Sequence, residues 1–400
     1  MAVQISSEIS GIDSRSPSWS SVLALSLGAF ALVASEFMPV SLLTPLASDL
    51  GVSEGQAGQA IAVSGAFAVL TSLFISSVAG RLDRRILLLA LTGLMIVSGT
   101  IAAFAPNFAI FMVGRAFIGV AIGGFWSMSA ATTMRLVPVN QVPKALAIVN
   151  GGNALATVIA APLGSFLGGF IGWRGAFFFI VPIAAVAFLW QFMSLPSLKI
   201  DSQSRAGNVF KLFKTPVVAL GMIAVSLFFM GQFALFTYVR PFLETVADVE
   251  VSMLSLILLM IGVAGFVGTI LIGSILKEGR LYATLITIPV VMAAIALSLV
   301  AFQGWLPVTA LLLGAWGLFA TSAPVGWWTW LANTLPNDAE AGGGLMVAVV
   351  QLAITLGATV GGLLFDNVGY QTTFVASAAI LLMAALLALL TARSSRGLVD

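Results

Sequence analysis

Two charged residues lie deep inside long apolar stretches of this sequence, and they are its strongest candidates for chemistry. Glu36 lies in the stretch 19–46, and Arg115 lies in the stretch 108–134. A charged side chain inside a membrane-spanning helix is costly unless it is neutralised, paired or in contact with water. A carboxyl group that gains and loses a proton would meet this requirement, and so would a permanent tie to a neighbouring helix.

Glu36 and Arg115 fall at similar depth if both stretches cross a bilayer as helices. Glu36 lies ten residues from Leu46 and Arg115 eight residues from Asn107, which correspond to roughly 15 and 12 Å at 1.5 Å per residue. Burial favours the neutral form of a carboxyl group, and a nearby guanidinium favours its charged form. A movement that separates the two groups would therefore bind or release a proton. The alternative is a static pair that fixes helix packing.

Amide and aromatic side chains inside the apolar stretches could recognise a flat, polar, neutral solute. Amides hydrogen-bond to polar ring edges and hydroxyl groups, and indole rings stack on planar rings. Buried amides often bind neighbouring helices instead, and tryptophans near the ends of spans often anchor them at the membrane surface. The candidate solute contacts are Trp126, Asn150, Asn153, Gln232, Tyr238, Trp327, Trp328 and Gln351.

The composition excludes most other chemistry. Of the 400 residues, 60% are hydrophobic and 8% are charged, whereas roughly a quarter are charged in soluble domains. The absence of His and Cys excludes imidazole and thiolate metal sites, disulfides and the common nucleophile–base pairs. No Gly-Lys pair and hence no Walker-type phosphate loop is present. We therefore expect a membrane protein that is not an enzyme and has neither a metal site nor a cofactor.

Twelve apolar stretches, separated by charged or turn-rich breaks, are long enough to cross a bilayer as helices. They cover 19–46, 56–79, 86–104, 108–134, 144–170, 175–195, 217–239, 252–276, 281–302, 306–332, 342–365 and 372–392.

The break at 196–215 is longer and more polar than the others, so it is the predicted linker between two halves. The first half covers 19–195 and the second covers 216–392, with tails at 1–18 and 393–400. The predicted fold is an all-α membrane protein with twelve transmembrane helices in two six-helix halves.

Basic residues are distributed unevenly between the two sides of this predicted bundle. An even number of spans places both termini and the linker on one side. That side collects all of the 17 Lys and Arg residues except Arg115 within a span, and Arg174 and Arg240 on the opposite side. Basic residues accumulate on the cytoplasmic side of membrane proteins. We therefore expect a multi-pass protein of the bacterial inner membrane with both termini in the cytoplasm.

The two halves also contain similar segments. Gly164-Ser-Phe-Leu-Gly-Gly169, followed by Gly172-Trp-Arg, recurs as Gly357-Ala-Thr-Val-Gly-Gly362, followed by Gly369-Tyr-Gln. Internal repeats are typical of secondary transporters, in which a site near the midplane lies between halves that move against each other. In such a protein the cluster Asp83, Arg84 and Arg85 could be a latch between the halves, or a basic anchor at the membrane surface.

These features resemble the major facilitator superfamily. Gly80-Arg-Leu-Asp83-Arg84-Arg85 resembles a loop motif of that superfamily, and Arg115-Ala-Phe-Ile-Gly119 and Ala160-Ala-Pro-Leu-Gly164 resemble motifs of its drug:proton antiporter branch. The resemblance implies proton coupling for Glu36 and Arg115 and a latch for Asp83. The shortened loop and the pair Ala160-Ala161 depart from the family pattern, but neither departure removes a titratable group.

More narrowly, several segments resemble the bacterial purine ribonucleoside efflux pumps of this branch. They include Glu36-Phe-Met-Pro-Val-Ser-Leu-Leu, Gly124-Phe-Trp-Ser-Met-Ser-Ala, Thr237-Tyr-Val-Arg-Pro and Pro324-Val-Gly-Trp. The resemblance implies a secondary antiporter that uses the proton gradient to export purine ribonucleosides, such as inosine and guanosine, by alternating access. A multidrug or sugar efflux antiporter is the alternative. The expected partners are a small-molecule solute, protons and the lipid bilayer, without nucleic acid, and the expected oligomeric state is a monomer.

Overall fold

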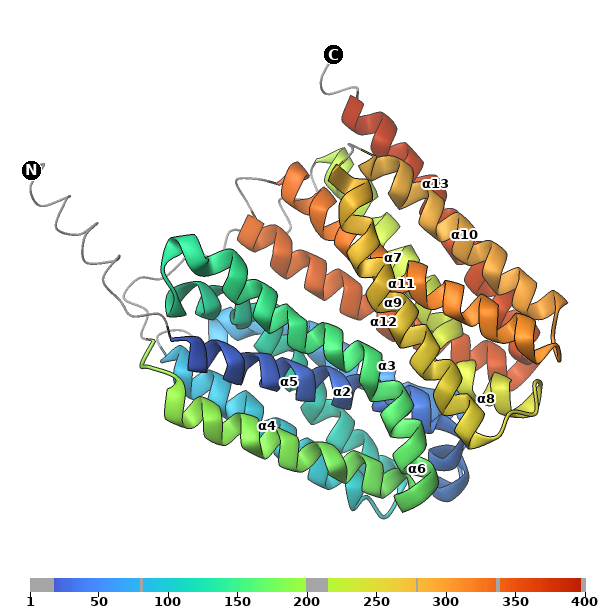
Figure 1. Cartoon of the computed structure of the whole chain (residues 1–400), viewed down its shortest axis with the longest axis horizontal. Coiled ribbons are helices and arrows are strands. Elements are labelled where there is room, and N and C mark those ends of the chain that lie inside the picture. Colours follow the sequence, from blue (N-terminus) through green and yellow to red (C-terminus); the bar gives the residue numbers. More distant parts are fainter. Residues whose placement is uncertain (1–17, 80–81, 199–214, 278–279, 336–338, 397–400) are drawn as a thin grey trace, which may run out of the picture.

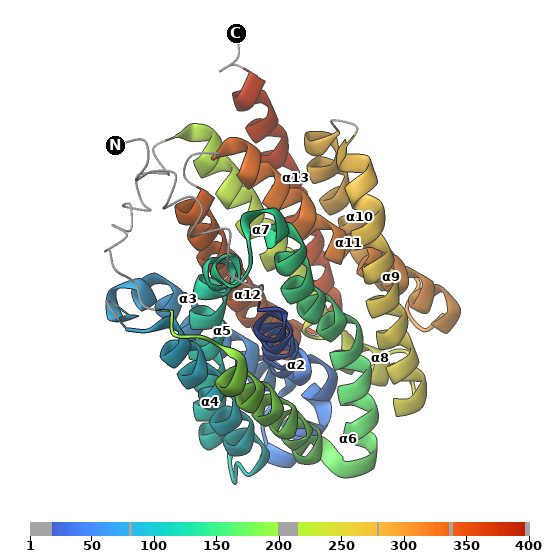
Figure 2. The ribbon, with the colours of Figure 1, turned by 60° about the vertical axis from the view of Figure 1, so that its left-hand side comes forward.

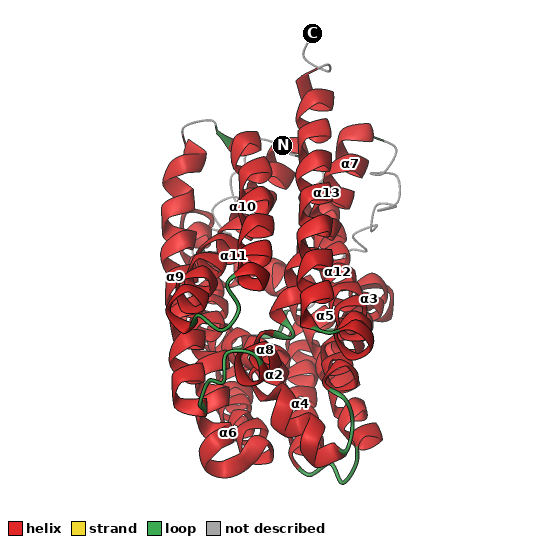
Figure 3. Ribbon diagram, turned by 90° about the vertical axis from the view of Figure 1, so that its right-hand side faces the viewer, coloured by secondary structure: helices red, strands yellow, loops and turns green. Residues whose placement is uncertain are grey.

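The computed structural model describes residues 18–79, 82–198, 215–277, 280–335 and 339–396. Every regular element in these ranges is a helix, and short loops join the helices (Figure 3). The tails 1–18 and 393–400 and the linker 196–215 lie largely outside the described residues. The helices are α2 (Trp19–Leu50), α3 (Glu54–Ala79), α4 (Arg84–Ala103), α5 (Phe108–Leu136), η1 (Val139–Gln141), α6 (Val142–Ser194), α7 (Pro216–Phe236), α8 (Val239–Thr245), α9 (Val251–Lys277), α10 (Leu281–Ala301), α11 (Leu306–Thr334), α12 (Ala339–Val368) and α13 (Tyr370–Arg396).

The described residues contain 11 helical segments long and apolar enough to cross a membrane. The segment in α6 is two spans, because Gly172 has a φ of 73° and interrupts the helix there. Glycine adopts this left-handed conformation without the steric penalty that other residues incur. Gly369, at the corresponding position of the repeat, has a φ of 101° between α12 and α13. The prediction of an all-α protein with twelve membrane spans is confirmed.

The helices pack in two groups, which occupy the lower left and upper right of Figure 1. The first half comprises α2 to α6, and the second half comprises α7 to α13. Each half has its own large cluster of buried apolar side chains. The start of α2 and the end of α13 lie at one end of the bundle, which we name the terminal end. We name the opposite end the distal end.

Helix α2 lies in the middle of the bundle and is seen nearly end-on in Figure 2. It packs along α6 and also contacts α3, α5 and α8. Two prolines, Pro39 and Pro45, lie inside it. A proline has no N–H group with which to bond the carbonyl oxygen four residues earlier. The carbonyls of Ser35 and Ser41 therefore have no intrahelical donor and can accept hydrogen bonds from other elements.

The two halves contact each other mainly through α3 against α12 and α6 against α9. In the second of these contacts the hydroxyl oxygens of Ser165 and Ser255 are 3.0 Å apart. Among the described residues, the hydrogen bonds that join the halves lie at mid-depth or in the distal part of the bundle.

Candidate functional site

Arg115 is the most completely hydrogen-bonded charge in the interior of the first half. Its side chain projects from α5, and the residue is 1% exposed. The guanidinium donates at 2.8–3.0 Å to the carbonyl oxygens of Ala60, Ser35 and Glu36 and to the hydroxyl of Ser64. Arginine suits this role because its planar guanidinium directs five donors in fixed directions.

The sequence of α2 and α5 explains why the guanidinium can reach these acceptors. Pro39 leaves the carbonyl oxygen of Ser35 without its helical donor, and Arg115 supplies the missing hydrogen bond. Gly119 allows α5 to lie against α3, because a Cβ there would fall 2.3 Å from the carbonyl oxygen of Ser64. A glycine thus permits the close approach of the two helices, and a proline leaves the carbonyl acceptor free.

The carboxylate of Glu36 bridges the two halves. Its Oε1 accepts a hydrogen bond of 3.1 Å from Nε2 of Gln351 on α12, and the two residues are 4% and 7% exposed. Arg115 contacts the main chain of Glu36, and none of the ion pairs among the described residues joins the two side chains. The charges lie at matched depth, as their positions in the sequence predict, but the direct partner of the carboxylate is an amide from the other half.

An aromatic pair also joins the two halves, and one of its members follows Glu36 in α2. Phe37 of α2 stacks on Phe233 of α7, with ring centroids 5.7 Å apart. Gln232, the neighbour of Phe233, is 9% exposed. Within the described part of the chain, Oε1 of Gln232 and Oε1 of Gln351 are buried without a hydrogen-bond partner. The free acceptor of Gln351 lies beside Glu36 at the contact between the halves, and the free acceptor of Gln232 lies inside the second half on α7.

A carboxylate of the second half caps the start of α3. Asp366 accepts a hydrogen bond of 2.9 Å from the N–H of Gly55 and another from the hydroxyl of Ser53. The first N–H groups of a helix lack intrahelical acceptors and favour negative charge. The second half thus supplies the anion that stabilises the distal end of α3.

Arg240 makes a second contact between the halves at the distal end. This residue of α8 is 4% exposed, and its Nη1 donates to the carbonyl oxygen of Ser41, the acceptor that Pro45 frees. Its Nη2 lies 2.8 Å from the carboxylate of Glu244. The contacts of Asp366 with Ser53 and Gly55, and of Arg240 with Ser41, are the distal seal.

Tyr238 packs within this region, which differs from its predicted role as a solute contact. It is fully buried, its hydroxyl donates to the carbonyl oxygen of Ala358 at 2.8 Å, and its ring stacks on Phe365 with centroids 5.2 Å apart. Gly58 leaves room for the ring, because a Cβ there would lie 2.1 Å from the Tyr238 hydroxyl oxygen. Tyr238 therefore packs between α3 and α12 in this structure, and its role as a solute contact stays a prediction.

Substitution of Gly58 by Ala is expected to weaken the contact between α3 and α12. The new methyl group would displace the Tyr238 ring and break its hydrogen bond, and overpacking of this kind costs about 1–3 kcal/mol. Thermal unfolding of the purified variant measures the loss. Gly273→Ala is the matched control, since that helical glycine has no atom within 4 Å of a new Cβ. Equal stability of the two variants would contradict the packing role.

The other predicted aromatic contacts are dispersed. Trp327 is 2% exposed and packs edge-to-face on Trp330 with centroids 5.8 Å apart, so it is reassigned to the core of the second half. Trp328, next in the helix, points outward and is exposed. Trp126 is half-buried and packs edge-to-face on Phe125.

The two predicted asparagines lie on α6. Asn150 is exposed, and its side chain donates to the carbonyl oxygen of Leu146 in the same helix at 3.0 Å. Asn153 is half-buried. The structure does not bring either residue into the hydrogen-bonded group around Glu36.

The predicted latch residues contact the first half and the start of the predicted linker. Asp83 caps α4 through the N–H of Arg85 and also accepts from the N–H of Leu198 at 2.8 Å and from the hydroxyl of Ser197. Arg85 donates to the carbonyl oxygen of Phe192 at 2.7 Å, and Arg84 approaches Met128. These contacts hold the terminal end of the first half together, and a latch to the second half stays a prediction.

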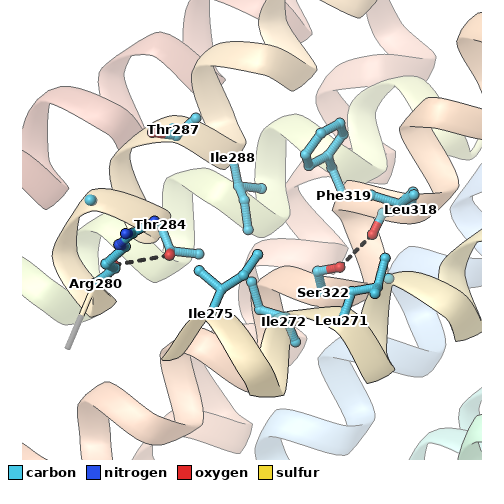
Figure 4. Close-up of a pocket in the computed structure, with 12 residues that line it drawn as sticks. Leu271, Ile272, Ile275, Arg280, Thr284, Thr287, Ile288, Leu318, Phe319 and Ser322 are labelled. Atoms are coloured by element: carbon cyan, nitrogen blue, oxygen red, sulfur yellow. Dashed lines mark hydrogen bonds between the residues drawn. The ribbon is translucent and has the colours of Figure 1, made fainter. Parts of the chain in front are cut away.

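Two apolar cavities lie away from Glu36. One, of about 320 Å³, lies between α9, α10 and α11 (Figure 4). The hydroxyls of Thr284 and Ser322 in its wall each donate to a carbonyl of their own helix. The other, of about 430 Å³, lies between α6 and α9 and is lined by apolar side chains such as Leu155 and Phe266. Neither wall is suited to recognition of a polar solute.

The distal seal is not predicted from the sequence. Arg240 is placed outside the predicted spans, although it directly follows an apolar stretch and has one acid, Glu244, a helical turn away. The available signal was the prolines of α2, since each predicts an unpaired carbonyl four residues earlier and therefore a donor from another helix.

Comparisons with known proteins agree with this architecture. A model of the Major Facilitator Superfamily matches residues 25–345. The chain is 44% identical over 370 residues to the purine ribonucleoside efflux pump NepI of Salmonella paratyphi B, covering 92% of this chain and 93% of that protein. It is 65% identical over 384 residues to the transcription regulatory protein OpdE of Pseudomonas aeruginosa, covering 95% of each.

Two solved structures share the fold. A D-xylose–proton symporter superposes with a TM-score of 0.75 at 18% identity, covering 93% of this chain and 97% of that one. A bacterial homologue of the human lysosomal transporter Spinster, in an inward-facing and unoccupied conformation, superposes with a TM-score of 0.75 at 16% identity, covering 95% and 98%.

Proposed function

The chain belongs to the Major Facilitator Superfamily, and from this premise we propose that it exports purine ribonucleosides, such as inosine and guanosine, in exchange for protons. The observation that carries the proposal is the buried carboxylate of Glu36, held at mid-depth by Gln351 of the opposite half. A carboxylate in this position changes its environment whenever the halves move. The 44% identity to a purine ribonucleoside efflux pump supports the choice of solute.

We assign the terminal end to the cytoplasm of a bacterial inner membrane, because the basic residues of the sequence concentrate there. The distal seal then joins the halves on the outer side in the described residues. In the proposed cycle Glu36 releases its proton in this state and takes up another when the seal opens. Arg115 contributes a fixed positive charge, because its four acceptors belong to the first half.

Solute recognition is proposed to use the unpartnered amide oxygens. Oε1 of Gln232 and Oε1 of Gln351 are buried acceptors, and a purine nucleoside offers ring N–H and ribose O–H donors. A donor placed there would relieve the cost of an unsatisfied buried acceptor, about 1–3 kcal/mol for each group. Trp126, Asn153, Asn150 and Trp328 remain proposed contacts of the solute when the halves move.

Substitution of Glu36 by Gln is expected to abolish proton-driven export while solute exchange continues. The amide keeps the shape and the hydrogen bond to Gln351 but cannot carry a proton. Uptake of labelled inosine into inverted membrane vesicles with an imposed pH gradient should fall at least tenfold, the equivalent of about 1.4 kcal/mol. Counterflow between solute on the two sides, without a gradient, should be retained.

Asp248→Asn is the matched control. Asp248 is an exposed acid with a φ of 50°, a conformation that asparagine tolerates. The control should transport as the natural protein does. Proton-driven export that survives in Glu36→Gln would eliminate Glu36 as the coupling carboxylate.

A multidrug or sugar efflux antiporter is the alternative within the same fold. Binding of inosine, a pentose and a cationic dye to the purified protein would separate the candidates. The buried carboxylate of Glu36 and the free amide oxygen of Gln351 beside it suit a neutral donor-rich solute. Preferential binding of the dye would favour multidrug export.

The name of the relative from Pseudomonas aeruginosa points to a second function, in transcription. We infer that any such effect of this chain would follow from the concentration of the transported solute. The Glu36→Gln variant separates the two roles, because it should lose the effect on transcript levels together with export. A retained effect in that variant would favour regulation that does not depend on transport.

A further inference from the structure

Helix α12 presents a row of polar side chains to the first half. Gln351 binds Glu36, Thr355 donates to the carbonyl oxygen of Ala62 at 3.2 Å, and Thr359 donates to Oε1 of Gln59 at 3.1 Å. The three residues lie four positions apart and therefore on one face of the helix. Asp366, farther along the same helix, belongs to the distal seal. Gln351 is the member of this row closest to mid-depth.

Gln351 uses only half of its hydrogen-bonding capacity. Its Nε2 donates to Glu36, whereas its Oε1 is buried without a partner within the described part of the chain. A carboxylate can only accept hydrogen bonds, whereas a carboxylic acid also donates one through its O–H. An amide can pair with either form, with its N–H group toward the carboxylate or with its oxygen toward the acid. Glutamine is therefore matched to a neighbour whose protonation changes.

The other polar groups around Glu36 do not have this property. Arg115 is the charged group whose field acts on the Glu36 carboxylate. Its donors are bound to three carbonyls and the Ser64 hydroxyl, and these acceptors do not change with the charge of Glu36. Gln351 is thus the partner that must reorient when Glu36 gains or loses a proton.

We propose that Gln351 is a positioning residue whose amide orientation depends on the protonation state of Glu36. The change in orientation alters the contact between the halves. When Glu36 is charged, Gln351 donates through Nε2, as in the described state. When Glu36 is protonated, the amide turns about its last side-chain bond and its Oε1 accepts a hydrogen bond from the carboxyl O–H of Glu36. The inference rests on the proposed function only in that Glu36 is taken to carry the proton.

The row on α12 provides the route of transmission. Gln351, Thr355 and Thr359 belong to one continuous helix, so a change in the bond at Gln351 displaces the neighbouring contacts with α3. Gly65 makes this contact close, because a Cβ there would lie 2.2 Å from the Thr355 hydroxyl oxygen. A closely packed contact transmits a small displacement rather than absorbing it.

The test is substitution of Gln351 by Met, which preserves length but removes both donor and acceptor. The ratio of proton-driven uptake of labelled inosine into inverted vesicles to counterflow is expected to fall at least tenfold relative to the natural protein. The double variant with Glu36→Gln should show no further loss, because both changes remove the same coupling. Gln371→Met is the matched control, since that exposed amide binds Gln303 far from Glu36.

Infrared difference spectroscopy between high and low pH gives a second readout. The band of the protonated carboxyl group that Glu36→Gln removes should shift in frequency in Gln351→Met, because the acid loses its acceptor. Gln351→Asn, which keeps the amide on a shorter side chain, serves if the Met variant does not fold, with the same expected direction.

The outcomes separate this inference from the proposed function. If Glu36→Gln loses proton-driven export but Gln351→Met and Gln351→Asn retain it with an unshifted band, the role of Gln351 is overturned and the function stands. Equal loss of counterflow and driven transport in the Gln351 variants also overturns it, since Gln351 would then act as a solute contact alone. If Glu36→Gln retains driven export, the proposed function fails instead.

Discussion

Replacement of Arg115 by Leu is expected to prevent accumulation of a stable, transport-competent protein. The change leaves three buried carbonyl oxygens and the Ser64 hydroxyl without the donor that they share. The carbonyl of Ser35 suffers most, because Pro39 has already removed its helical donor. Each unsatisfied buried group costs about 1–3 kcal/mol. The yield of monodisperse protein after extraction in detergent and its thermal unfolding measure the effect.

We expect the loss of stability to depend on the carbonyl and hydroxyl acceptors of Arg115, and not only on the loss of its positive charge. Arg115→Lys keeps the charge, but an ammonium group carries three donors at one point and cannot span four acceptors. Pro39→Ala returns an N–H group to Ser35, so Arg115→Lys should be less harmful in that background, a coupling that a double-mutant cycle measures.

Arg174→Leu is the control for loss of a guanidinium. Arg174 pairs with Asp49, and its side chain is 40% exposed, so its loss should cost about 1 kcal/mol or less. Comparable losses at Arg115 and Arg174 would contradict the role assigned to the buried acceptors.

Replacement of Arg240 by Met is expected to shift the protein toward a state that is open at the distal end. Arg240 is buried at the contact between the halves, where it joins Ser41 of α2 to Glu244 of its own helix. The substitution removes the hydrogen bond to the other half and leaves the Ser41 carbonyl unsatisfied. A loss of about 1.4 kcal/mol from the closed state corresponds to a tenfold change in population.

Oxidative cross-linking can measure this shift directly. Cysteines in place of Ser165 and Ser255, whose hydroxyl oxygens are 3.0 Å apart across α6 and α9, should cross-link readily when the distal end is closed. The natural chain has no cysteine, so no background cross-link arises. Cross-linking should slow severalfold with Arg240→Met and remain unchanged with Arg393→Met, an exposed arginine near the end of α13. An unchanged rate in Arg240→Met would show that the distal seal does not depend on Arg240.

The fold was predictable because it depends on the length and apolarity of the spans. The break between the fifth and sixth spans was also visible, since Gly172 recurs as Gly369 in the second half. The depth of Glu36 and Arg115 followed from the rise per residue of a helix. Sequence spacing gives the depth of a residue along a helix, but not the direction in which its side chain points.

This limit explains the differences at the candidate site. Gln351 was correctly placed at mid-depth, yet its contact with Glu36 depends on how α12 is rotated against α2. Tyr238 and Trp327 have polar atoms suited to a solute, but close packing of neighbouring helices buries both. Arg115 binds mainly main-chain carbonyls, and no residue type in the sequence marks such an acceptor apart from the proline that frees it.

Among the described residues the two buried arginines, Arg115 and Arg240, both bind α2 through main-chain carbonyl oxygens, which every amino acid carries. An alanine scan along this helix would therefore pass over the two anchoring points, since truncation of Ser35 or Ser41 leaves each carbonyl in place. Proline relocation, or ester linkages in a semisynthetic backbone, would reveal them. The same holds for natural sequence change: the hydrogen bonds to α2 can be altered only by moving a proline or by replacing the arginine that donates.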